Sequence, residues 1–139
     1  MGAGNKKLIK QAGIFLIVFI VAFFGTKYLM SKIKPNYELE KISADINKKG
    51  SVMIDAETRL ETSSVSGDTL KYIYTLVNVT KEDTTFDGKG AQQFIRTNAQ
   101  HNLDTDSRMS YYREKKIRLK YLYKDKNGKD LFNFTINTK

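Results

Sequence analysis

The longest apolar run of the chain lies near its N-terminus. Residues 12–30 read AGIFLIVFIVAFFGTKYLM, and no charge occurs in this run before Lys27. As an α-helix the run would extend about 28 Å, close to the hydrocarbon thickness of a bilayer. Such a helix would be apolar on every side, whereas a surface helix has a polar side. The pattern predicts a transmembrane anchor over residues 12–30, preceded by a basic tail over residues 1–11.

Two other interpretations of this run stay open. A cleaved signal peptide would use the lysines before the run as its basic region, but the bulky Phe23 and Phe24 stand where signal peptidase needs small residues. A buried helix of a soluble protein fits less well, because the run lacks a polar side. We therefore favour an uncleaved anchor.

Basic residues flank the run on both sides, so the positive-inside rule leaves its orientation nearly balanced. A short tail before a first span is usually retained inside, which predicts a single-pass protein of the bacterial inner (cytoplasmic) membrane with an exported C-terminal domain. The anchor would bind membrane lipid, with these residues at its flanks: Lys6, Lys7, Lys10, Lys27 and Tyr28.

The single proline of the chain, Pro35, marks a linker over residues 31–36. An extramembrane domain is expected over residues 37–139. Apolar residues recur at helical spacing between residues 36 and 49, and Gly50 follows as a natural C-terminal stop. The domain is therefore predicted to open with a short helix.

Two antiparallel strands are predicted after this helix, the first of them from alternating apolar and polar residues. The first covers residues 52–60. The second covers residues 70–79, which are dense in β-branched and aromatic side chains. Between them, residues 63–68 are rich in turn-forming types and predict the connection.

Helical spacing returns after the second strand. Residues 91–102 carry apolar side chains on one face, which predicts a helix ending near residue 102. Asp104 is placed to cap a second short turn, with Met109 and Tyr112 facing inward.

The C-terminal hairpin gives the clearest pattern. Residues 117–124 and 131–138 alternate, and Asn127 and Gly128 between them favour a type I′ turn with positive φ at both positions. The complete order of elements predicts an α+β fold. It consists of an antiparallel sheet of about four strands packed by short helices, in a cystatin-like element order.

The net charge of +9 comes largely from the first 34 residues, which contain six lysines and no acid. In the rest, residues 35–107 sum to −4 and residues 108–139 to +7. Clustered cations can steer an acidic partner, although a solvated strand face is the simpler interpretation. The candidate partner-binding stripe, on one face of strand 117–124, is Arg118, Lys120 and Lys124.

Chemical motifs are weak throughout. The chain has no cysteine, which excludes disulfides and thiolate chemistry. The single histidine, His101, has too few groups near it in sequence to predict a catalytic triad. Asp104 and Asp125 each begin a calcium-like stretch without the glutamate at position twelve. Gly88–Gly90 could hold an anion before a helix, but a flexible loop is simpler.

Tyrosines interleaved with cations in the predicted strands could stack on single-stranded nucleic acid. Such tyrosines more often form cross-strand pairs within a sheet. We therefore expect no enzyme activity, no cofactor, no metal and no nucleic-acid partner.

Three C-terminal segments, DTDSRM at residues 104–109, YLYKD at 121–125 and NGK at 127–129, resemble a pattern of small bacterial envelope proteins. In those proteins a short helix with an acidic start precedes a Y-x-Y-x-D-x-x-G hairpin. Members often carry cysteines where this chain has Asn102 and Lys139. The resemblance implies a domain held by a lipid or a single span, and it implies no catalytic residue.

The leading functional hypothesis is a non-catalytic, membrane-anchored envelope protein that binds another protein, as an accessory subunit of a membrane assembly. A ligand-binding or lipid-surface-binding module is the alternative, using a pocket between helix and sheet or the basic C-terminal segment. An enzyme with an unfamiliar site around His101 is the third hypothesis.

Overall fold

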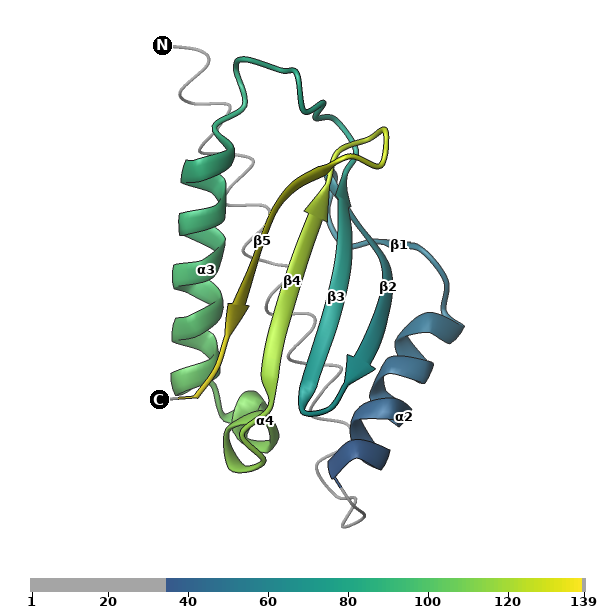
Figure 1. Ribbon diagram of the computed structural model, residues 1–139, viewed down its shortest axis with the longest axis vertical. Helices are drawn as coiled ribbons and strands as arrows, with labels where there is room; N and C mark the ends of the chain where they lie inside the picture. Colours follow the sequence, from purple (N-terminus) through teal and green to yellow (C-terminus); the bar gives the residue numbers. More distant parts are fainter. Residues whose placement is uncertain (1–34, 139) are drawn as a thin grey trace.

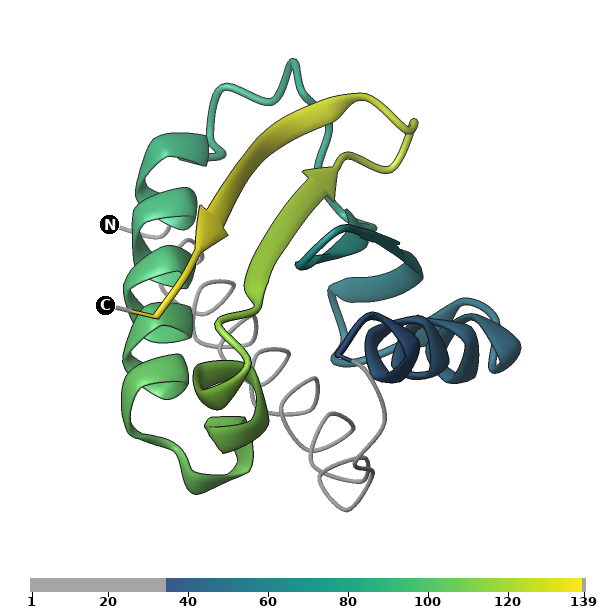
Figure 2. The same ribbon diagram turned by 60° about the horizontal axis from the view of Figure 1, so that its bottom comes forward.

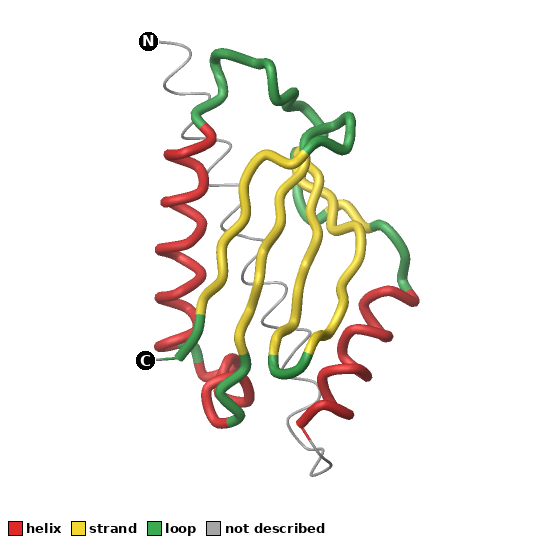
Figure 3. The backbone as a smooth tube through the Cα atoms, viewed as in Figure 1, coloured by secondary structure: helices red, strands yellow, loops and turns green. Residues whose placement is uncertain are grey.

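The computed structural model describes residues 35–138 (Figure 1). In this part of the chain, two longer helices flank a five-stranded sheet, and short helical turns lie at one end (Figure 3). The helices are α2 (Pro35–Lys48), α3 (Gly88–Thr105), the 3₁₀ turn η1 (Ser107–Met109) and α4 (Ser110–Glu114). The strands are β1 (Val52–Met53), β2 (Thr58–Ser66), β3 (Thr69–Leu76), β4 (Arg118–Lys124) and β5 (Asp130–Ile136).

The strands lie side by side in chain order, from β1 to β5. Neighbouring strands are antiparallel except β3 and β4, which run parallel. The parallel pair follows from α3, which carries the chain back along the sheet so that β4 starts beside the start of β3. The predicted antiparallel sheet of about four strands is therefore wrong. Between residues 35 and 138 the sheet is mixed and has five strands.

The helices predicted at 36–49 and 91–102 are confirmed, with slightly different bounds. α3 begins before the predicted start because the Asp87 carboxylate accepts a hydrogen bond from the Gly90 amide at 2.9 Å, which caps the helix. The glycine-rich stretch Gly88–Gly90 is thus the first turn of a helix, and the prediction of a flexible loop is wrong.

Asp106, and not Asp104, caps the short turn after α3. Its carboxylate accepts hydrogen bonds from the backbone amide of Arg108 at 2.9 Å and from the Arg108 guanidinium at 2.7 Å. The predicted cap is wrong because α3 continues beyond Asp104. Met109 and Tyr112 are buried, as predicted.

The first long strand starts later than predicted. β1 takes only two residues of the expected strand 52–60, while β2 includes most of the expected turn at 63–68. Helix α2 stabilises this polar strand. The Oγ atoms of Ser43 and Ser63 lie 2.8 Å apart, and the Asn47 amide donates to the Ser63 carbonyl at 2.8 Å. The strand bounds therefore depend on a tertiary contact.

β4 and β5 form the predicted hairpin, but with another turn. Gly128 has a φ of 83°, whereas Asn127 does not have a positive φ. The Gly128 amide donates to the Asp125 carbonyl at 3.0 Å, and the Asp125 amide donates to the Lys129 carbonyl at 2.8 Å. This is a type I turn followed by a left-handed glycine. The Asp125 carboxylate selects it by accepting from the Asn127 amide at 2.8 Å.

The sheet face toward α2 and α3, here the inner face, carries the aromatic core. Tyr72 and Tyr74 of β3 lie beside Tyr121 and Tyr123 of β4, and all four side chains are fully buried. The rings of Tyr74 and Tyr123 stack with their centroids 4.9 Å apart. These tyrosines form the predicted cross-strand pairs.

The predicted membrane anchor over residues 12–30 lies outside the described residues, together with its flanks Lys6, Lys7, Lys10, Lys27 and Tyr28. From residue 35 to residue 138, no helix combines the length and the apolar character that crossing a membrane requires. The single-pass architecture that we predicted is corrected to the fold that the structure describes, a mixed five-stranded sheet with its helices over residues 35–138.

Candidate functional site

The outer face of the sheet, opposite the tyrosines, carries the predicted cationic stripe. Both long helices lie on the other side of the sheet, α2 beside β2 and α3 beside β5 (Figure 2). The outer face therefore presents the remaining side chains of the central strands, and the strand register determines which of them meet.

Three cations gather at one end of the outer face. Lys71 of β3 lies directly beside Lys120 of β4. Arg118 comes two positions before Lys120 in β4 and is the previous residue on the same face. On their other sides, Lys71 pairs with Ser64 of β2 and Lys120 pairs with Thr135 of β5, and both of these partners are uncharged. Within residues 35–138, no carboxylate forms an ion pair with any of the three. We call Lys71, Arg118 and Lys120 the cationic patch.

An apolar pair lies next to the cationic patch. Ile73 and Leu122 are adjacent across β3 and β4, and both are half-buried on the outer face. Thr62 and Asn133 flank them on the two outer strands. An apolar centre beside polar and charged groups is the arrangement found at protein–protein interfaces.

The other end of the outer face is electrically balanced. Lys124 forms an ion pair with Asp130 at 3.3 Å, and Arg59 forms one with Glu61 at 2.9 Å. Partial burial would raise the pKa of Glu61, but hydrogen bonds, led by the one from Arg59, outweigh this and lower the pKa to about 2. Lys124 thus belongs to a neutralised end.

The structure therefore divides the predicted stripe. Arg118, Lys120 and Lys124 do share the outer face, but only Arg118 and Lys120 lie in the cationic patch. Lys71 completes the patch and was missed, because it lies 47 positions before Arg118 in the sequence. Only the parallel register of β3 and β4 brings Lys71 beside Lys120.

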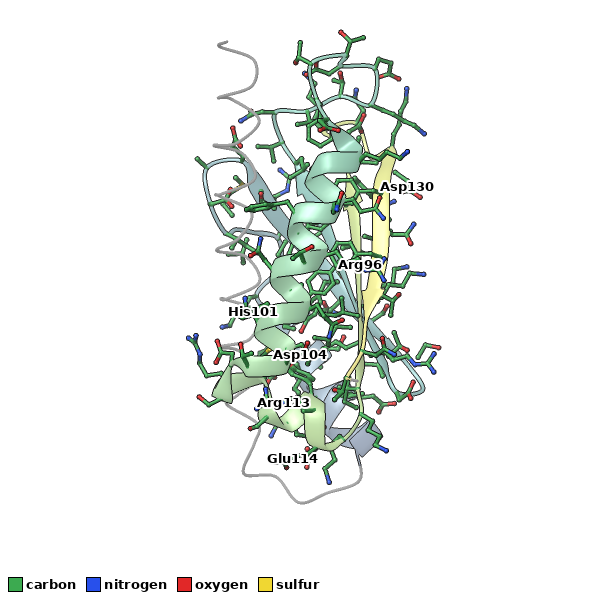
Figure 4. The ribbon with its side chains drawn as sticks, turned by 90° about the vertical axis from the view of Figure 1, so that its left-hand side faces the viewer. Arg96, His101, Asp104, Arg113, Glu114 and Asp130 are labelled. Carbon is green, nitrogen blue, oxygen red and sulfur yellow. The ribbon has the colours of Figure 1, made fainter. Side chains whose placement is uncertain are left out.

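The two carboxylates nearest to His101 in the sequence are engaged by other residues. His101 is exposed, and it lies one turn before Asp104 on α3 (Figure 4). The Asp104 carboxylate accepts from Gln100 at 3.0 Å, and Asp106 is held by Arg108 at 2.7 Å. The hydrogen bond from Arg108 lowers the pKa of Asp106. These carboxylates therefore have structural partners of their own.

Arg113 on α4 fixes the end of α3. Its guanidinium donates to the carbonyl of Leu103 at 2.8 Å and to that of Asp106 at 2.7 Å. Helix C-termini leave such carbonyls without partners in the helix, so this contact is structural.

The two calcium-like stretches have other roles in the structure. The Asp125 carboxylate accepts from the backbone amides of Lys81, Asn127 and Lys129 at 2.8 to 2.9 Å. It thereby ties the segment after β3 to the hairpin turn. Among the described residues, no group of three or more histidine, aspartate or glutamate side chains is placed to hold a metal ion.

Comparisons with known proteins give a family and a fold. No curated protein matches the chain. A similar solved structure is the crystal structure of a "putative secreted protein (PA3611)" from Pseudomonas aeruginosa, with a TM-score of 0.53 and 13% identity, covering 76% of this chain and 95% of that one. This identity supports a shared fold alone.

The inner-membrane, single-pass location that we predicted is corrected to what these findings carry: the similar structure is described as that of a secreted protein, and between residues 35 and 138 no helix is long and apolar enough to cross a membrane. The model of a domain of unknown function, DUF8479, matches residues 35–132, from the start of α2 into β5. This match covers more than half of the chain, and the chain therefore belongs to the DUF8479 family.

Proposed function

We propose that the protein is a non-catalytic binding module whose outer sheet face binds an acidic surface of another protein. The carrying observation is the cationic patch, in which Lys71 and Lys120 lie side by side and form no ion pair with a carboxylate of residues 35–138. Like charges directly opposite each other across strands destabilise a sheet. A partner carboxylate near both lysines would remove that repulsion.

The apolar pair specifies the partner further. Ile73 and Leu122 form an apolar surface that would lose its water when a partner binds, and the cationic patch lies on one side of this apolar pair. The matching surface has an apolar side chain with acidic groups on one flank. Charges of this kind mainly raise the association rate and set the orientation, and salt screens them.

The test uses full-length protein and fluorescein-labelled poly-L-glutamate as a defined acidic probe, followed by fluorescence anisotropy. Reversing the patch with K71E, R118E and K120E should weaken binding about tenfold or more. Raising the salt concentration should weaken binding by the original protein in the same way.

A matched control changes the net charge equally at sites away from the outer face. The exposed residues for this control are Lys48, Lys89 and Lys115, each replaced by glutamate. The control should keep most of the binding. Equal losses in both triple variants would show that only net charge matters, and the proposal would then fail.

A further inference from the structure

One lysine close to the cationic patch has an unusual backbone conformation. Among residues 35–138, φ is positive at three glycines, Gly50, Gly67 and Gly128, and at Lys116, where it is 53°. Glycine adopts this left-handed region without strain, whereas the Cβ of any other residue approaches the following carbonyl oxygen. The described part of the chain thus uses glycine at every other position of this kind and a lysine here.

The end of α4 imposes the positive φ on Lys116. The Lys116 amide donates to the Arg113 carbonyl at 3.2 Å. The next amide, that of Ile117, donates to the Tyr112 carbonyl at 2.9 Å. These two hydrogen bonds form a Schellman motif, in which the left-handed residue is usually glycine. Because Ile117 is buried in the core, the chain has to turn at Lys116.

The fold itself gives no reason for a lysine at this turn. Lys116 is exposed, and no carboxylate of the described domain forms an ion pair with it. The lysine therefore costs stability, and no ion pair within residues 35–138 compensates for that cost. Backbone strain of this kind is concentrated at functional sites, where the side chain has a task outside the fold.

The position of Lys116 suggests this task. Arg118 of the cationic patch follows it by two positions, so their Cα atoms lie at most about 7 Å apart. The Arg118 amide donates to the Asp68 carbonyl at 2.9 Å, which fixes the start of β4 beside α4 (Figure 1). Lys116, Arg118 and Lys120 therefore form a row of cations up to about 14 Å long, which extends beyond the sheet.

We propose that Lys116 is a binding residue of the outer-face site, an inference that rests on the proposed function. Its ammonium group extends the cationic patch past the end of β4, and the chain keeps lysine there although glycine would be more stable. The partner then carries a row of acidic groups up to about 14 Å long, which begins beside its apolar contact and continues toward α4. A glycine at position 116 would give a more stable domain that binds more weakly.

Thermal unfolding of the full chain measures the strain. K116G should raise the melting temperature by about 3–6 °C, because glycine relieves the strain but loses more backbone entropy on folding. K116Q keeps the strain and should leave the melting temperature unchanged. The reverse change, G50K, should lower the melting temperature by a similar amount, since φ is 71° at Gly50 and an added Cβ meets no atom within 4 Å.

Fluorescence anisotropy with fluorescein-labelled poly-L-glutamate measures binding by the same variants. K116G and K116Q should both weaken binding about two- to fivefold, the loss expected for one exposed ion pair. The matched control is K126Q, which removes an exposed cation from the hairpin turn at the other end of the sheet. This control should bind like the original protein.

Several outcomes overturn the inference. If K116G does not raise the melting temperature, the position is not strained and lysine there needs no functional explanation. An equal loss of binding in K126Q would show that only net charge matters. If both Lys116 variants bind like the original while the triple variant K71E/R118E/K120E binds more weakly, the site ends at the sheet and only the proposed function stands. If the triple variant also binds like the original, the proposed function itself fails.

Discussion

The contact between Asn47 and β2 supports a quantitative prediction. Beyond the short β1, the edge of β2 has no strand partner among the described residues, and Asn47 of α2 takes that place. Its side-chain amide donates to the Ser63 carbonyl at 2.8 Å, and its side-chain carbonyl accepts from the Ser63 amide at 2.7 Å. We predict that N47A destabilises the domain.

The magnitude follows from these two hydrogen bonds. Each contributes about 1 kcal/mol net, and the Ser63 groups lose their partner when the side chain is removed. In a helix, alanine is more favourable than asparagine by roughly 0.5 kcal/mol, and this difference offsets part of the loss. The expected decrease in the free energy of unfolding is about 1.5 kcal/mol, equivalent to roughly 6–12 °C in melting temperature for a domain of this size.

Urea unfolding of the full chain, followed by circular dichroism, measures this decrease. N47D keeps the acceptor and loses the donor, so its stability should lie between N47A and the original. K48A, at the exposed neighbouring position, should stay within about 0.5 kcal/mol of the original. Equal stability of N47A and K48A would refute the idea that α2 holds the edge of β2.

Three further predictions concern single residues. G128V should lower the free energy of unfolding, measured with urea, by about 1–2 kcal/mol. The cause is backbone strain, because φ is 83° at Gly128 and an added Cβ meets no atom within 4 Å. An unchanged unfolding midpoint would place the turn elsewhere. D87A should cost about 1 kcal/mol through loss of the α3 cap, and D87N should restore most of it. Folding lowers the pKa of Glu61 to about 2 from a usual 4.5, so its carboxylate stabilises the domain above pH 4.5 and loses this effect as the pH falls toward 2. E61Q should therefore flatten the curve of stability against pH between these values. Identical curves for E61Q and the original protein would contradict the assignment.

Local sequence patterns were sufficient for several elements. Helical spacing located α2 and the centre of α3, and alternation located both strands of the C-terminal hairpin. A high density of β-branched and aromatic residues located β3. The burial of Tyr121 and Tyr123, with Lys120 and Lys124 on the other face, also follows from alternation. These features depend on side chains a few positions apart, which any window of the sequence contains.

Tertiary structure decided the features that depend on distant residues. The bounds of β2 follow from Asn47 on another element, and the hairpin turn follows from a carboxylate that also binds the Lys81 amide, 44 positions away. The cationic patch needs Lys71 beside Lys120, which only the crossover through α3 and the parallel register produce. Sequence periodicity assigns a face to each side chain, but the order and direction of strands are set by long-range packing, which no local pattern contains.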